Sequence, residues 1–289
     1  MPRSAMSSDS IVSRYPAMRR DMHALLDQCA LISQSLASHK SDSQREHNAK
    51  LIFSKLVGHG ISMYRLAPSG IIPEKPNSTE FWDVSSLFCL ARALVESFDA
   101  LAYVAIEEVT EEERSFRVCL WQLHAEDRKL QALKLIQSQR PELVSLATNI
   151  DVLRNQLSAL PFVGQLNKEA RSEVLGRKIP PFHIRAPERN RRNGVNHEYY
   201  TASYILLSAH THSYPMAIDQ LAAFQAGDEE SLRLIALPTQ YAIGFISKGL
   251  LGIYQVFSKF VPPMQENVRD IVETWAGIVE NGISRASAK

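Results

Sequence analysis

The chain has 289 residues, of which 45% are hydrophobic and 22% are charged, a balance typical of a globular protein with a sizeable core. Lysine and arginine together number 32 against 31 acidic residues, so the whole-chain charge predicts neither nucleic-acid nor membrane binding. Any interaction with a polyanion must therefore come from a local patch. No motif in the chain fixes a reaction, so whether it is an enzyme stays open.

The three cysteines, Cys29, Cys89 and Cys119, are far apart and belong to no CxxC or Cys/His pattern, which argues against zinc. Their apolar surroundings favour buried free thiols in a reducing compartment. The N-terminal residues lack the apolar run of a signal peptide. We therefore expect a cytoplasmic protein, and nothing in the sequence implies a cofactor.

The first 15 residues are polar and are predicted to form a mobile tail, with Pro16 opening the first helix. Beyond Pro16, apolar residues recur at three- and four-residue steps, which is the pattern of amphipathic helices. The helices expected from this pattern cover approximately residues 16–38, 42–66, 80–109, 111–139, 141–160, 167–177, 197–213, 228–260 and 263–286.

A loop with three prolines, residues 67–79, separates the first two expected helices from the others. No window shows the sustained alternation of a strand. The sequence therefore predicts an all-α fold, a single multi-helix bundle of about eight or nine helices over residues 16–289. Within it, residues 16–66 could form an N-terminal arm on a central bundle of residues 80–286.

The most apolar part of the chain, Leu234–Phe260, also resembles a membrane segment in composition. Its longest uncharged run, Leu234–Ser247, is 14 residues, and Lys248 ends it. A membrane-spanning helix needs about 18 or more apolar residues. The sequence therefore predicts a core helix with Lys248 at the surface, and no membrane partner.

Two of the expected helices meet at Thr110 with almost no linker, so they are predicted to be antiparallel neighbours. Counted from that turn, Glu96 and His124 lie at the same level, and Arg92 lies near the level of Asp127. We therefore expect the side chains of each pair to come within hydrogen-bond or ion-pair reach.

A polar stripe on the expected helix 197–213 completes this pattern, because Tyr204, Ser208 and His212 recur every four residues. If that helix packs on the hairpin, a polar cluster forms from Arg92, Glu96, His124, Asp127, Ser208 and His212. Asp99 shares the face of Arg92 and Glu96. The cluster is either a functional site or a set of ion pairs and caps that fix helix register. A metal ion is not expected, because Arg92 would place a positive charge where the cation sits.

A basic connector spans residues 177–192 and carries six cationic residues against one acidic residue, Glu188. Its prolines, together with Gly194 just beyond it, predict irregular structure over residues 178–196. The connector is either a solvated loop or a contact for RNA or another polyanion. The candidate nucleic-acid contacts are Arg177, Lys178, Arg185, Arg189 and Arg191.

The connector ends in the sequence RNGVNH, from Arg192 to His197. This resembles the R-polar-x-x-x-H motif of the HEPN superfamily, helical bundles that include metal-independent ribonucleases of toxin and phage-defence systems. The resemblance implies a homodimer in which the arginine and histidine lie at the interface and cleave RNA. Arg192 would then stabilise phosphate charge, and His197 would be the general acid or base.

A second resemblance covers two segments, Leu90–Val104 and Tyr204–Pro215. Together they are similar to an uncharacterised bacterial helical family with an Arg-x-x-x-Glu helix and a later Ser-x-x-x-His. The matching residues are Arg92, Glu96, Ser208 and His212. This resemblance implies no activity.

Two functional hypotheses follow from the sequence. The first is a HEPN-like protein directed at RNA or a nucleotide, in a bacterial defence or stress system. The alternative is a non-catalytic helical interaction or sensor module, whose polar cluster only fixes helix register. Close approach of Arg192 and His197 across a dimer would favour the first, and a fully paired, sealed cluster would favour the second.

Overall fold

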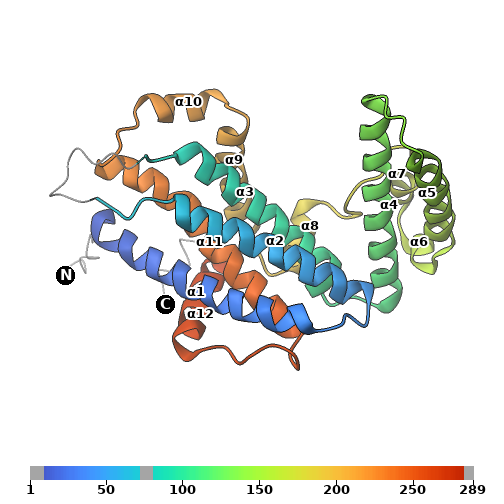
Figure 1. Ribbon diagram of the computed structural model, residues 1–289, viewed down its shortest axis with the longest axis horizontal. Coiled ribbons are helices and arrows are strands. Elements are labelled where there is room, and N and C mark those ends of the chain that lie inside the picture. Colours follow the sequence, from blue (N-terminus) through green and yellow to red (C-terminus); the bar gives the residue numbers. More distant parts are fainter. Residues whose placement is uncertain (1–9, 72–80, 283–289) are drawn as a thin grey trace, which may run out of the picture.

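The structure is a computed structural model that describes residues 10–71 and 81–282. Within these ranges it consists of helices and contains no strand, which confirms the all-α prediction (Figure 1). The helices are α1 (Ile11–Ser38), α2 (Gln44–Leu66), α3 (Val84–Leu101), the π-helix η1 (Ala102–Ile106), α4 (Glu111–Leu135), α5 (Glu142–Ala159), α6 (Pro161–Gln165), α7 (Lys168–Val174), α8 (Ala186–Arg192), α9 (His197–Thr211), α10 (Pro215–Ala222), α11 (Glu229–Val256) and α12 (Glu266–Asn281).

Three short helices, α6, α8 and α10, were not expected, so the predicted count of eight or nine is too low for the twelve α-helices of the described residues. Each of the three has a proline in its first turn, namely Pro161, Pro187 and Pro215. Proline is favourable there because its fixed φ suits a helix and the missing N–H has no helical partner. Proline also disfavours the interior of a helix, and the prediction of an irregular connector over residues 178–196 considered only that effect, so it missed α8.

The first helix begins earlier than predicted. Ser10 caps α1, and its Oγ accepts a hydrogen bond of 3.2 Å from the backbone N–H of Val12. Ile11 and Tyr15 are buried, so residues 11–15 belong to the helix and not to a tail. Residues 1–9 of the predicted tail lie outside the described residues, as do residues 72–80 and 283–286 of the expected loop and helices.

A main core holds α1, α2, α3, α9, α11 and α12 together, and these helices form the larger part of the molecule in Figure 1. Its largest fully buried apolar side chains include Tyr15, Met22, Phe53, Phe88 and Phe245. Because α1 and α2 bury their apolar faces in this core, the expected N-terminal arm is wrong.

The centre of the main core is α11, which packs against α1, α3 and α12. In the described part of the chain, it is the one helix long and apolar enough to cross a membrane, and 72% of its most apolar window is buried in the protein. A core helix of a soluble protein meets the same criteria. Lys248 is less exposed than predicted: its side chain is 12% exposed, and its Nζ lies 2.6 Å from Glu280 Oε1.

The three cysteines are free thiols, as predicted. Cys29 and Cys119 are buried, whereas Cys89 is half-buried. Burial raises the pKa of the Cys29 thiol to about 12, so this group stays protonated and unreactive near neutral pH.

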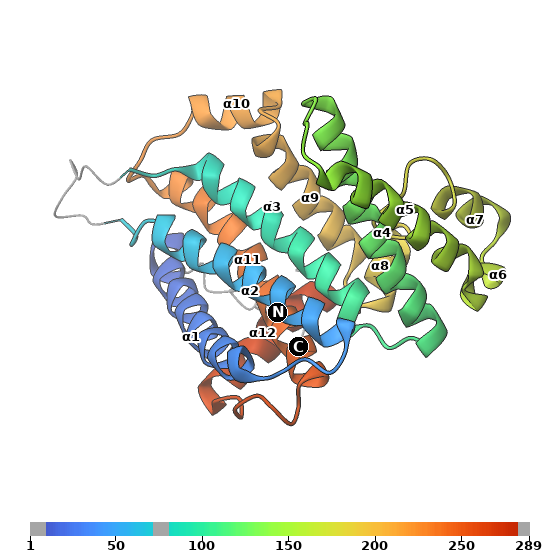
Figure 2. The ribbon, with the colours of Figure 1, turned by 45° about the vertical axis from the view of Figure 1, so that its right-hand side comes forward.

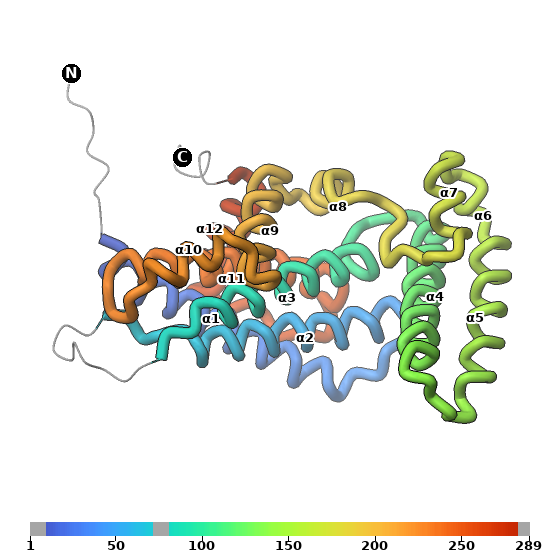
Figure 3. Tube along the Cα trace, turned by 90° about the horizontal axis from the view of Figure 1, so that it is seen from above, coloured from blue at the N-terminus to red at the C-terminus, as the bar shows by residue number. Residues whose placement is uncertain are grey.

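A second core is formed by α4 to α7 and lies at one end of the main bundle, as seen from above in Figure 3. Its buried residues include Phe116, Leu120, Ile150, Leu157 and Phe162. In Figures 1 and 3, α4 crosses the end of the bundle and does not run back along α3. The predicted antiparallel hairpin is therefore wrong.

The change of direction between α3 and α4 occurs at η1, which widens the end of α3 by a π-type hydrogen bond of 3.0 Å from Glu107 N–H to Ala102 O. Ile106, the last residue of η1, packs directly on Gly252 of α11, where any Cβ would overlap it. Single π-turns of this kind often mark functional regions.

Candidate functional site

Part of the predicted polar cluster forms around Arg92. Its Nε lies 3.0 Å from Glu96 Oε1, its Nη1 lies 3.0 Å from His212 Nε2, and its Nη2 donates to the Tyr204 hydroxyl at 2.8 Å. Ser208 lies one turn before His212, and its buried Oγ has no hydrogen-bond partner in the described residues. The structure thus brings α3 and α9 together at Arg92, Tyr204 and His212.

The other two members of the predicted cluster lie elsewhere. His124 Nδ1 is 2.8 Å from Ile179 O, and Asp127 Oδ2 accepts a hydrogen bond of 2.7 Å from Gln131. Both residues belong to α4, which forms part of the second core. The predicted pairs Glu96–His124 and Arg92–Asp127 are therefore wrong, because α4 turns away from α3 at η1.

The two residues of the HEPN-like motif face different surroundings. Arg192 donates to three carboxylates, those of Glu188 at 2.7 Å, Glu107 at 3.1 Å and Glu113 at 2.9 Å. His197 Nδ1 lies 3.0 Å from Asn190 Nδ2, and the His197 side chain lines a different cavity, which is described below. Catalysis by this pair across a dimer stays a prediction.

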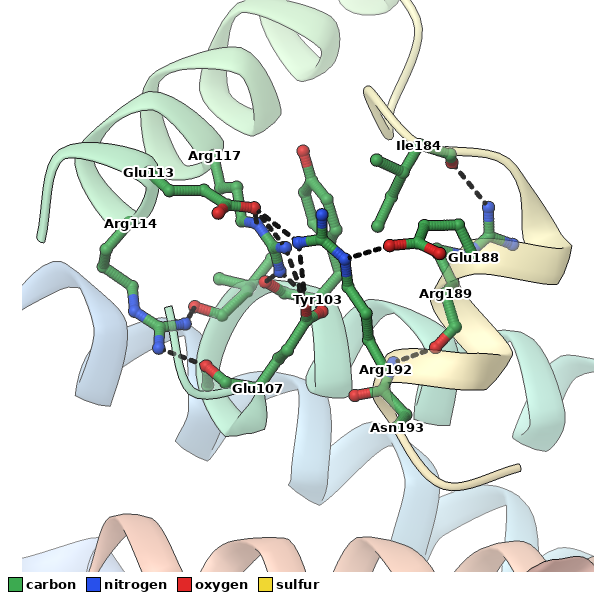
Figure 4. Close-up of polar contacts among 12 residues, drawn as sticks. Tyr103, Glu107, Glu113, Arg114, Arg117, Ile184, Glu188, Arg189, Arg192 and Asn193 are labelled. Carbon is green, nitrogen blue, oxygen red and sulfur yellow. Dashed lines mark hydrogen bonds and ion pairs between the residues drawn. The ribbon is translucent and has the colours of Figure 1, made fainter. Parts of the chain in front are cut away.

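Arg192 belongs to a carboxylate–arginine network that also contains Glu107, Glu113 and Arg117 (Figure 4). The Arg117 side chain is fully buried, and its guanidinium forms a bidentate ion pair with the Glu107 carboxylate at 2.8 and 2.9 Å. It also donates to Glu113 Oε1 at 2.6 Å and to Tyr103 O at 2.9 Å. The network therefore ties α8 and α4 to the π-helix η1.

The charges of this network balance, because two guanidinium groups face the carboxylates of Glu107 and Glu113, and Glu188, which also contacts Arg192, is paired with Arg191. Burial alone would raise the pKa of Glu113, but Arg117 and Arg192 outweigh it and hold that pKa below its ordinary value. Burial among aromatic rings, with Arg117 nearby, lowers the pKa of the adjacent His183 to about 4. A satisfied, neutral network of this kind fixes the register of the elements that it joins.

The five predicted nucleic-acid contacts divide into two groups. Arg189 pairs with Asp99, with Nη2 3.3 Å from Oδ2, and Arg191 pairs with Glu188 at 2.8 Å. Arg177, Lys178 and Arg185 are exposed. Of the five proposed contacts, these three therefore lie at the surface and form no ion pair in the described residues.

A cavity of about 670 Å³ lies where the two cores meet, between α3, α9 and residues 181–189. Figure 2 shows α9 running beside α3, with α8 near the beginning of α9. Four aromatic side chains line the cavity: Trp121, Phe182, Tyr200 and Tyr204. The rings of Tyr200 and Tyr204 are stacked with centroids 6.0 Å apart, and those of Trp121 and Phe182 lie 5.7 Å apart. We call this cavity the aromatic pocket.

The polar part of the aromatic pocket is centred on Asp99, which is 7% exposed. Its Oδ2 accepts hydrogen bonds from the Tyr200 hydroxyl at 2.6 Å and from Arg189 Nη2 at 3.3 Å. Burial raises the pKa of Asp99, although Arg189 and Tyr200 act against this shift. Burial and the neighbouring Asp99 carboxylate also raise the pKa of Tyr200. A carboxyl with a shifted pKa in a cavity is a candidate for function.

The sequence analysis named parts of this site without joining them. Asp99 was noted on the face of Arg92 and Glu96, and Arg189 was assigned to polyanion binding, while Tyr200 was missed. The available signal was Asp99 itself, since a carboxylate inside an apolar helix needs a buried partner. Which residues supply that partner depends on the packing of α8 and α9, which no local pattern specifies.

In the residues that the structure describes, no group of three or more His, Cys, Asp or Glu side chains is arranged to hold a metal ion. Comparisons with protein families, with curated proteins and with solved structures found no match. The geometry of the aromatic pocket is therefore the basis on which a function can be argued.

Proposed function

We propose that the protein is a helical sensor module that binds a small organic molecule in the aromatic pocket. The observation that carries this proposal is the Asp99 carboxylate, buried in the lining of a cavity that also contains four aromatic side chains. Burying a charge costs free energy, and carboxyl groups with a shifted pKa that line a cavity occur often at functional sites. Volumes of roughly 300–1,000 Å³ with a few convergent polar groups are typical of small-molecule sites.

The composition of the pocket favours binding over covalent catalysis. Ser97, a potential nucleophile in the lining, donates its hydroxyl to Ala93 O at 2.7 Å. His197 Nδ1 is engaged with Asn190. The pocket also lies between two cores, so an occupant would contact α3, α9 and Trp121 of α4 at once, and this placement suits a sensor.

Filling the pocket is expected to weaken ligand binding. Ala93 lines the cavity, and an Ala93→Phe ring would occupy much of the space that a ligand needs. A panel of small aromatic acids, amines and neutral heterocycles is titrated while Trp121 fluorescence is followed. At least one compound should quench this fluorescence saturably, with affinity at least about tenfold weaker in Ala93→Phe.

The matched control is Ala132→Phe, which adds the same ring at an exposed position of α4. It should bind like the original protein. Loss of the saturable signal in Trp121→Phe identifies Trp121 as the reporter. The proposal fails if no compound binds saturably, or if Ala93→Phe binds as well as the original protein.

Polyanion binding by the basic connector is a second candidate, favoured by the exposure of Arg177, Lys178 and Arg185. Three phosphate contacts predict a slope of about −2 for log K against log salt with single-stranded RNA. Replacing all three by alanine should remove RNA retention at about 50 mM salt. Arg191→Ala is the control, because Glu188 already neutralises this residue. Equal retention by the triple variant and the original protein would exclude this surface.

A further inference from the structure

We infer that the ligand of the aromatic pocket is a planar nitrogen heterocycle whose ring stacks on the aromatic side chains and whose N–H group donates to Asp99. This inference rests on the proposed function and adds the chemical class of the ligand. Three features of the pocket support it. They are the aromatic rings of the lining, the arginine side chains that lie over two of these rings, and the Asp99 carboxylate, in which one oxygen accepts both described hydrogen bonds.

The rings that line the pocket come from three separate elements, α4, the segment before α8, and α9. Tyr200 and Tyr204 of α9 stack with an interplanar angle of 16°, so two nearly parallel rings belong to the lining. Trp121 and Phe182 supply further rings in the same lining. A flat aromatic ligand gains contact area and favourable stacking on such side chains, and an aliphatic chain does not gain the stacking.

The protein's own cations already use these rings. The guanidinium of Arg189 lies 4.3 Å from the centroid of Phe182, and that of Arg92 lies 4.7 Å from the centroid of Tyr204. The lining itself carries two cationic and two anionic side chains, so it has no net charge that would attract a charged ligand. A neutral ring avoids the cost of desolvating a charge there.

The hydrogen-bonding groups at the polar end indicate what the ring must carry. Both described hydrogen bonds to Asp99 end on Oδ2, which leaves Oδ1 to accept from a ligand. A carboxylate oxygen that is free to accept matches a heterocycle whose exocyclic amino group donates to it.

The test compares 2-aminopurine, which has an exocyclic amino group beside ring nitrogens, with purine, which lacks this group. Binding of 2-aminopurine is followed through quenching of its own fluorescence, and purine is measured by competition. The original protein should bind 2-aminopurine at least about tenfold more tightly than purine, since a hydrogen bond to a charged acceptor contributes this much.

Two variants separate the role of the carboxylate from that of the rings. Asp99→Asn keeps the shape but removes the charge, so the ratio of the two affinities should fall to about threefold or less. Tyr204→Leu removes one stacking ring, so both affinities should fall by about tenfold while their ratio stays unchanged. Because each ratio is measured within one variant, a moderate loss of stability does not obscure it.

The inference is overturned if the original protein binds both compounds equally, or if Asp99→Asn leaves the ratio unchanged. If acids or amines of the panel bind in an Ala93-dependent manner and 2-aminopurine does not, the ligand class is wrong and the proposed function stands. If no compound binds in the pocket, both fail.

Discussion

Replacing Arg117 with methionine is expected to lower the free energy of unfolding by about 3 to 5 kcal/mol. The Arg117 side chain is fully buried and supplies the hydrogen bonds that hold Glu107 and Glu113 in the carboxylate–arginine network. Methionine fills much of the same space but donates nothing, so two poorly solvated carboxylates lose their main partner. Urea denaturation at neutral pH measures the change.

The matched control is Arg191→Met, whose side chain is 71% exposed and pairs only with Glu188 in the described residues. Exposed pairs of this kind contribute under about 1 kcal/mol. Adding Glu107→Gln and Glu113→Gln to Arg117→Met should restore part of the stability, because no unpaired buried charge then remains. Equal effects of Arg117→Met and Arg191→Met would show that the network is solvated.

Acidification is expected to destabilise the protein through His183 before the carboxylates titrate. In the folded protein the pKa of His183 is lowered to about 4, whereas an unfolded histidine titrates near pH 6.5. Between these two pKa values, the unfolded chain binds a proton at this histidine and the folded protein does not. The stability from His183 is complete above pH 6.5 and is lost progressively towards pH 4, in total on the order of 3 kcal/mol.

The comparison is between the original protein and His183→Gln, with unfolding free energies measured from pH 7 to pH 5. The variant should lose up to about 1.4 kcal/mol per pH unit of the acid-side slope, which corresponds to one proton. His23→Gln is the control, because the His23 side chain is 56% exposed and pairs with Asp27 on the surface. An unchanged slope in His183→Gln would contradict the assignment.

The helices themselves were predictable because their signals are local. Period-3.6 apolar patterns placed most long helices, and caps such as Thr110, which accepts from Glu113 N–H at 3.2 Å, set their beginnings. The short helices α6, α8 and α10 were missed because each begins with a proline. A proline disfavours the helical turn before it but favours the turn that it opens, and the sequence does not say which effect decides.

The direction of α4 was not predictable from the length of its linker. A short connection requires that two helix ends be close, but it leaves the angle between the helices undetermined. Here η1 and the packing of Ile106 on Gly252 set that angle. The side-chain pairs predicted from an antiparallel hairpin are therefore all wrong. The contacts of Arg92 with Glu96 and His212 are present because they depend only on α3 and α9.

The candidate site was predictable only in fragments. Spacing found Arg92, Glu96 and His212, since those residues repeat at helical steps on their own elements. The pairing of Asp99 with Arg189 joins residues 90 positions apart, and it requires the position of α8 on α3. Sequence patterns report which residues share a face, but they do not report which face meets another across the core.

The second core has a consequence for local unfolding. Its buried residues all come from one continuous stretch, Phe116 to Ile179, while the main core is drawn from the chain on both sides of that stretch. Both ends of the stretch are fastened near each other, because Glu107 precedes it and Arg192 follows it, and these two side chains are paired. We therefore expect the helices of the second core beyond α4 to open and exchange their amide hydrogens while the main core stays closed. Protection from exchange should accordingly be lower in α5 than in α3, which belongs to the main core.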